Sequence, residues 1–162
     1  ESSRSRSQRP TLARQTLAGV LLDGKRYEEA ARKLQEGLSL DPSQASMAMI
    51  LARLQVEKGE LQAAVDTLQR TLPYDTDRAD YCAFLAALLQ RQARHKDAIA
   101  QYIVALRKMP QNAVWWMGLG ISLQAENRTA EAQEAFGKAK ASNTLSPELQ
   151  AFVEQKITQI QH

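Results

Sequence analysis

Apolar residues recur along this chain at a fixed period of 34 residues. In blocks that start at residues 11, 45, 79 and 113, a leucine and a small residue hold one position, as Leu17-Ala18, Leu51-Ala52, Leu85-Ala86 and Leu119-Gly120. Twelve residues further on, each block has an alanine, at Ala30, Ala64, Ala98 and Ala132. Four residues later comes a large apolar residue, at Leu34, Leu68, Tyr102 and Phe136. This spacing predicts two amphipathic helices per block, a helix A followed by a helix B.

The pattern resembles four tetratricopeptide repeats, at residues 11–44, 45–78, 79–112 and 113–146. The resemblance implies an all-α fold, a right-handed superhelical solenoid of four helix hairpins. The small residues then mark points where helix A and helix B approach closely, and the large ones fill the remaining space. Because one hairpin cannot bury its apolar face alone, we expect the stability to come from the stacking of neighbouring repeats.

Turn and cap residues fit this division into hairpins. We expect the A helices to end near Asp23-Gly24, Lys58-Gly59, Arg94-His95 and Asn127-Arg128, where the chain must reverse. Pro42, Pro73 and Pro110 follow the B helices and prevent their continuation.

A last helix is predicted at residues 147–161. Ser146-Pro147-Glu148 is typical of a helix start, with a capping serine, a proline in the first turn and an early acid. Its apolar residues are Leu149, Phe152, Val153, Ile157 and Ile160. We expect this stripe to cap the exposed apolar face of the fourth repeat, so that one repeat domain spans residues 11–162.

Charge and composition argue against several classes of function. The net charge is +3, but three arginines and one glutamate lie in the polar segment 1–10, which leaves +1 for the repeats. A nearly neutral repeat array lacks the basic stripe that follows phosphates, so we do not expect it to bind nucleic acid. Segment 1–10 is too poor in apolar residues to fold and is predicted to be a disordered linker.

We expect no enzymatic activity and no cofactor or metal. The two histidines, His95 and His162, are far apart in sequence and have no evident catalytic partner. No phosphate-binding loop, metal-ligand pair or nucleophile motif is present. The one cysteine, Cys82, holds a packing position and is predicted to be a buried, inert thiol.

The function is therefore predicted to lie in a surface. In this class of repeat the A helices line the concave face, and positions 2, 5, 9, 12 and 13 are not required for packing. These positions supply the predicted partner-binding residues, which are Met49, Arg53, Val56, Ala83, Ala87, Arg91, Val114, Met117, Ile121 and Gln124. They would suit an apolar helix or extended peptide, oriented by the arginines. Alternatively, the alanines and methionines pack against neighbouring A helices.

One known use of this groove fits the sequence poorly. Some repeats of this type grip a peptide's C-terminal carboxylate with lysine and asparagine at positions 5 and 9. This chain has Gln15, Gly19, Met49 and Arg53 there, so a chaperone-binding clamp is disfavoured.

Three segments, 80–91, 112–123 and 145–149, resemble the C-terminal repeats of the mannose-sensitive haemagglutinin (MSHA) type IV pilus biogenesis protein N family. The resemblance implies a periplasmic location at the bacterial inner membrane, with an N-terminal anchor that precedes this segment. It also implies other pilus assembly components as partners. The first repeat departs most, with Arg14 at the usual tryptophan position, and the second has Gln55 where leucine or an aromatic residue is usual.

Adjacent tryptophans form part of this resemblance. Trp116 occupies a packing position and is predicted to be core. Trp115 points about 100° away on the helix. It either wedges against helix B of the third repeat or is partly exposed as an anchor for a partner.

These observations favour a non-enzymatic scaffold that binds another protein or peptide, in assembly of an MSHA-type pilus. One alternative is a general peptide-binding adaptor or co-chaperone. The other is a self-associating structural module, in which the uncapped first repeat stacks on a second copy as a homodimer.

Overall fold

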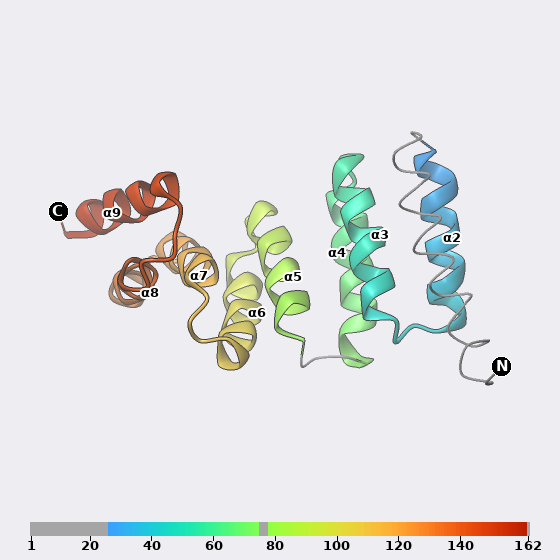
Figure 1. Cartoon of the computed structure of the whole chain (residues 1–162), viewed down its shortest axis with the longest axis horizontal. Helices are drawn as coiled ribbons and strands as arrows, with labels where there is room; N and C mark the ends of the chain where they lie inside the picture. Colours follow the sequence, from blue (N-terminus) through green and yellow to red (C-terminus); the bar gives the residue numbers. More distant parts are fainter. Residues whose placement is uncertain (1–25, 75–77, 162) are drawn as a thin grey trace. The chain divides into compact units, whose positions relative to one another are not determined.

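The computed structural model describes residues 26–74 and 78–161, in which helices joined by short loops are present and no strand occurs. Figure 1 shows the helices in chain order. They are α2 (Tyr27–Leu40), α3 (Ala45–Glu57), α4 (Leu61–Thr71), the short 3-10 helix η1 (Leu72–Tyr74), α5 (Ala79–Arg91), α6 (His95–Lys108), α7 (Ala113–Ala125), α8 (Thr129–Ala141) and α9 (Pro147–Gln161). The predicted all-α fold is confirmed. The predicted linker, the A helix of the first repeat, Gly24 and His162 lie outside the described residues.

The helix boundaries follow the 34-residue period. The A helices α3, α5 and α7 begin at the block starts Ala45, Ala79 and Ala113. The B helices α2, α4, α6 and α8 begin at Tyr27, Leu61, His95 and Thr129, which are also 34 residues apart. The hairpin partners α3 and α4, α5 and α6, and α7 and α8 pack closely against each other.

The chain forms two compact units, residues 1–76 and 77–162. The described part of the first unit contains α2, α3, α4 and η1. The second contains α5 to α9, with each hairpin packed on the next element along the chain. Each unit has its own apolar core, around Leu34 and Leu51 in the first and around Phe136 in the second.

The repeated small and large positions form these cores. The four alanines of helix B are fully buried, at Ala30, Ala64, Ala98 and Ala132. The large residues four positions later are also buried, at Leu34, Leu68, Tyr102 and Phe136. Neighbouring helices approach the backbone of α7 especially closely, because a methyl group added at Gly118 or Gly120 would overlap a neighbouring aromatic ring. The hairpins therefore depend on small residues where helices meet.

The turns between helix A and helix B share one backbone conformation. Gly59, Ala93 and Asn127 have φ values of 84°, 59° and 60°, respectively, and lie 34 residues apart. The prediction that Arg94-His95 reverses the chain is wrong by one or two residues, since Ala93 holds the left-handed position and His95 begins α6. The repeat fixes the register of this turn, and Ala93 is strained there because alanine disfavours positive φ.

The last helix covers the fourth repeat. The Ser146 hydroxyl accepts a hydrogen bond from the Leu149 amide at 3.3 Å, as expected of a capping residue. Val153 is fully buried in the core around Phe136, and Phe152, Ile157 and Ile160 pack against the same core. Helix α9 thus buries apolar surface that the fourth repeat would otherwise expose.

Candidate functional site

The predicted groove residues of the first unit are only partly accessible. Met49 retains 7% of its surface exposed, so its side chain serves packing. Arg53 is exposed and Val56 is half-buried. The first unit therefore offers little of the apolar surface that the sequence predicted there.

In the second unit, α5 contributes one accessible charge. Ala83 is buried and Ala87 is half-buried, so these alanines mainly allow close packing. Arg91 is exposed, and no acidic group among the described residues lies within ion-pair distance of its guanidinium. Arg91 is therefore available to an acidic group of a partner.

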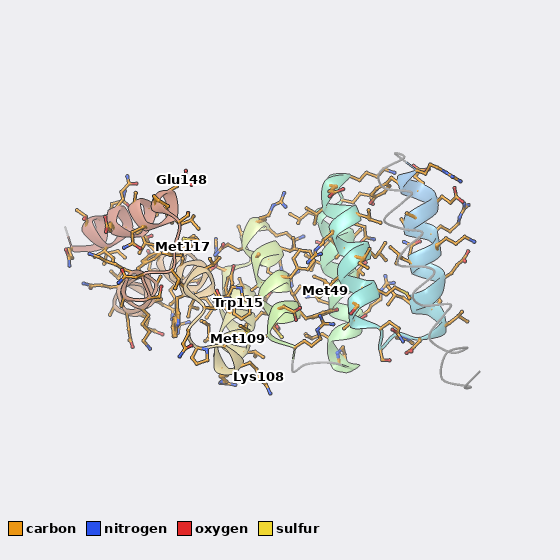
Figure 2. All side chains as sticks on the ribbon, viewed as in Figure 1. Met49, Lys108, Met109, Trp115, Met117 and Glu148 are labelled. Carbon is orange, nitrogen blue, oxygen red and sulfur yellow. The ribbon has the colours of Figure 1, made fainter. Side chains whose placement is uncertain are left out.

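Helix α7 contributes the apolar part. Val114 has 49% of its surface exposed, a large fraction for an aliphatic side chain. Met117 and Ile121 pack partly against the core around Phe136, and Gln124 is half-buried. Figure 2 shows Met117 and Trp115 on α7, with Lys108 and Met109 where α6 ends. Met109 adds further exposed apolar surface at that end.

Hydrogen bonds hold α5 against α7. The side-chain amide of Gln90 donates to the Gly118 carbonyl and to the Ser122 hydroxyl, both at 2.8 Å. Ser122 is fully buried, and its hydroxyl lies 3.0 Å from Nδ1 of His95. The Ser122 hydroxyl therefore pairs with both Gln90 and His95, and the imidazole tautomer sets which of Oγ and Nδ1 donates.

His95 therefore has a hydrogen-bond partner that the sequence did not predict. Its partner lies 27 residues away on another helix, and sequence spacing alone does not reveal such a contact. The role supported by the geometry is structural, since Gln90, Ser122 and His95 fix α5, α6 and α7 relative to one another. We call the surface that they support the α5–α7 face, and it consists of Ala87, Arg91, Val114, Met117, Ile121 and Gln124.

Of the two adjacent tryptophans, Trp116 is the one that departs from its prediction. Trp115 is half-buried and packs against the core around Phe136. Trp116 packs against the same core but is also only half-buried, so the prediction of a core residue is wrong in degree. Its indole N–H donates to the Pro110 carbonyl at 2.6 Å, and Lys138 Nζ lies 4.4 Å from its ring centroid. An indole needs a hydrogen-bond acceptor, and finding it in the α6–α7 loop keeps this ring near the surface.

Tyr102 lies beneath α7, close to Gly118. Burial raises the pKa of its hydroxyl from 10.0 to about 12. The folded state therefore disfavours the phenolate, and stability present below pH 10 is lost as the pH rises toward 12.

We expect Tyr102→Phe to remove part of this alkaline destabilisation. The pKa shift corresponds to about 2–3 kcal/mol of unfolding free energy lost between about pH 10 and pH 12. Denaturant titrations of both proteins across this range would measure the difference. Tyr27, whose pKa burial also raises to about 12, keeps its own contribution in the variant. Identical pH profiles for the two proteins would contradict the assignment to Tyr102.

The described residues contain no group of three or more histidine, cysteine or acidic side chains that could hold a metal ion. Cys82 is buried. A search of the same residues finds no helix that is long and apolar enough to cross a membrane.

Comparison with known proteins defines the class. Two family models, both described as tetratricopeptide repeat, match residues 21–88 and 85–147. The chain therefore belongs to the tetratricopeptide-repeat proteins, whose repeats typically act as protein-interaction scaffolds and not as enzymes.

Individual relatives are distant. The chain is 26% identical over 152 residues to the BBSome complex member bbs-4 of Caenorhabditis elegans, covering 90% of this chain and 33% of that protein. It thus spans about a third of this curated relative. Among solved structures, Pseudomonas aeruginosa PilF has a TM-score of 0.75 and 22% identity, covering 94% of this chain and 68% of that one. YrrB, described as a repeat protein with an unusual peptide-binding site, has a TM-score of 0.74 and 16% identity, covering 88% and 73%. At these identities the likeness shows the fold alone.

Proposed function

We propose that the α5–α7 face binds an apolar segment of a partner protein that also carries an acidic group. The observation that carries this proposal is Val114, which is 49% exposed on the same helix as Met117 and Ile121. Methionine adapts its shape to varied apolar partners, and an exposed arginine suits a carboxylate. The hydrogen bonds of Gln90 hold the two helices of the face in place before binding, which lowers the ordering cost.

We further propose that this binding serves the assembly of an MSHA-type pilus on the periplasmic side of the bacterial inner membrane. Support comes from the resemblance of residues 80–91, 112–123 and 145–149 to the MSHA biogenesis protein N family. In that setting the partners are other pilus assembly components, and the membrane is reached through an N-terminal anchor outside this segment. The tetratricopeptide-repeat fold, which typically serves protein interaction, agrees with such a role.

We expect Val114→Glu to weaken partner binding by at least about tenfold, because it places a charge in an apolar contact. The side chain is already half exposed, so the fold should tolerate the change. Ile103→Glu is the matched control, since Ile103 is 36% exposed on α6 in the same unit but outside the α5–α7 face. All three proteins should show the same helicity and melting temperature.

The experiment is a pull-down from a bacterial envelope extract, followed by affinity measurement with the captured protein. Capture of a pilus assembly component by the parent and by Ile103→Glu, but not by Val114→Glu, is the expected result. Equal capture by all three would overturn the α5–α7 face as the site. Capture of proteins unrelated to pili would overturn the biological setting alone. Recovery of nothing but this chain, with concentration-dependent sedimentation, would favour self-association.

A further inference from the structure

The first unit contains a pocket of about 570 Å³ that involves none of the predicted groove residues. Its walls come from α2 and α4, which Figure 1 shows in the blue and green part of the chain, and α3 supplies the buried residues Leu51 and Gln55. Leu38 and Pro42 add apolar surface, and Thr67 and Thr71 add hydroxyls. This volume falls within the range of ordinary ligand sites, which is roughly 300–1,000 Å³.

Buried polar side chains concentrate at this pocket. Among the described residues, four polar side chains are buried, and three of them, Gln55, Thr67 and Thr71, line it. The fourth is Ser122, which belongs to the α5–α7 contact. Since a buried polar group is costly unless it is hydrogen-bonded, three at one place require an explanation.

The other repeats show what ordinary packing would use at these positions. Leu89 and Leu123 stand where the second repeat has Gln55, and both are buried. Ala105 and Ala139 stand where it has Thr71, and both are buried as well. The fold therefore does not need polar groups at these positions, so their presence in the second repeat points to a ligand.

The Gln55 carboxamide has unused hydrogen-bonding capacity. It is 5% exposed, and its Oε1 accepts a hydrogen bond from the Thr67 hydroxyl at 2.8 Å. That hydroxyl is also 2.9 Å from the Ala63 carbonyl, and its single hydrogen can serve only one acceptor. The nearer acceptor is Oε1 of Gln55, which keeps a second lone pair free. The two N–H groups of Gln55 have no hydrogen-bond partner among the described residues that line the pocket.

The charges at the pocket cancel. Asp66 and Arg70 are the two charged residues among its lining side chains. Asp66 accepts a hydrogen bond from Gln62 at 2.9 Å, and Arg70 has no ion pair within the described residues. A pocket with one charge of each sign gives no net attraction to a strongly charged ligand. An uncharged group with both a donor and an acceptor matches the free N–H groups of Gln55 and the second lone pair of its carbonyl oxygen.

We propose that this pocket binds a short, uncharged segment of a partner protein that places an asparagine side chain against Gln55. Two carboxamides can pair through two N–H···O=C hydrogen bonds, and the neighbouring aliphatic residues of the segment contact Leu38, Leu51 and Pro42. The site lies in a different unit from the α5–α7 face and extends beyond the function proposed above.

The test uses the 162-residue chain, labelled with ¹⁵N, and two blocked peptides, acetyl-Leu-Asn-Ala-amide and acetyl-Leu-Leu-Ala-amide. The central residues have nearly the same shape and differ in hydrogen bonding. We expect the asparagine peptide to shift the side-chain amide resonance of Gln55 in a saturable way. The leucine peptide should bind at least about fivefold more weakly, because it offers no acceptor to the N–H groups of the Gln55 carboxamide.

We expect Gln55→Leu to abolish the preference for the asparagine peptide and to raise the melting temperature by about 2–8 °C, as it restores the residue of the other repeats. Thr71→Ala, which copies Ala105 and Ala139, is a second variant in case Gln55→Leu alters the packing, and it should weaken the preference. Val114→Glu should bind the asparagine peptide like the parent, which separates this proposal from the α5–α7 face.

Three results would overturn the proposal: equal affinity for the two peptides, a preference that survives Gln55→Leu, or no saturable shift at Gln55. A fall in melting temperature for Gln55→Leu, with the fold intact, would show that the glutamine serves stability and would also count against the proposal.

Discussion

Phe136→Ala is expected to lower the free energy of unfolding by about 3–5 kcal/mol. Phe136 is fully buried, and its core includes Leu119 and Leu123 from α7 and Val153 from α9. Removing the ring leaves a cavity that the surrounding helices can fill only in part. Denaturant unfolding followed by circular dichroism would measure the loss.

Phe152→Ala provides the matched control for this substitution. Phe152 packs against the same core but is only partly buried, and Lys156 Nζ lies 5.4 Å from its ring centroid. Truncation there should cost clearly less than truncation at Phe136. Equal losses for the two variants would show that α9 contributes as much to the core as the repeat itself.

Gly118→Ala and Gly120→Ala are each expected to destabilise the chain by about 1–3 kcal/mol, although alanine is the better helix former. A Cβ at Gly118 would lie 2.5 Å from Cζ and Oη of Tyr102. At Gly120 it would lie 2.7 Å from Cε1 of Phe136. Neither ring can move without disturbing the packing of helix B on helix A. Thermal and denaturant unfolding of the single variants would measure both effects.

The chain offers its own control in Gly137. This glycine lies within α8, and an added Cβ there would meet nothing within 4 Å. Gly137→Ala should therefore stabilise the protein by about 0.5–1 kcal/mol through helix propensity alone. A loss of stability at Gly137 similar to that at Gly120 would contradict the steric explanation.

A double-mutant cycle connects the two predictions. In a Phe136→Leu background, the ring that obstructs a Cβ at Gly120 is absent, so Gly120→Ala should cost less than in the parent. The pair should therefore be non-additive, as expected for residues in direct contact. Strict additivity would mean that the clash is relieved elsewhere.

The two proposed binding sites differ in chemistry. The α5–α7 face offers exposed apolar groups and an exposed arginine, whereas the pocket of the first unit offers a buried carboxamide and hydroxyls. Because each lies within one compact unit, a substitution at one should leave binding at the other unchanged. The protein would then present two different kinds of site to its partners.

The sequence by itself determined the helical fold and its register. The 34-residue period predicted block starts at Ala45, Ala79 and Ala113, and α3, α5 and α7 begin at those residues. This is possible because each hairpin repeats the same local pattern of small, large and turn residues. The positions most constrained by packing, such as those of Ala98 and Leu34, therefore carry the same residue or the same type of residue in every repeat.

The exposure of individual side chains could not be read in this way. Met49 and Met117 occupy the same repeat position, yet Met49 is buried while Met117 is only partly so. Trp116 occupies a packing position and is half-buried. The burial of a side chain depends on the neighbouring helices that pack over it. Their residues differ from repeat to repeat even where the backbone pattern is the same.

Only the tertiary structure decided which polar side chains form hydrogen bonds with one another. Gln90, Ser122 and His95 come from three helices, and Gln55 and Thr67 from two. Gln55 was visible in the sequence as a departure from the leucine of the other repeats, but not as part of a pocket. The period fixes backbone geometry because it acts through local contacts, whereas a site depends on hydrogen bonds between side chains that are distant in sequence and differ in every repeat.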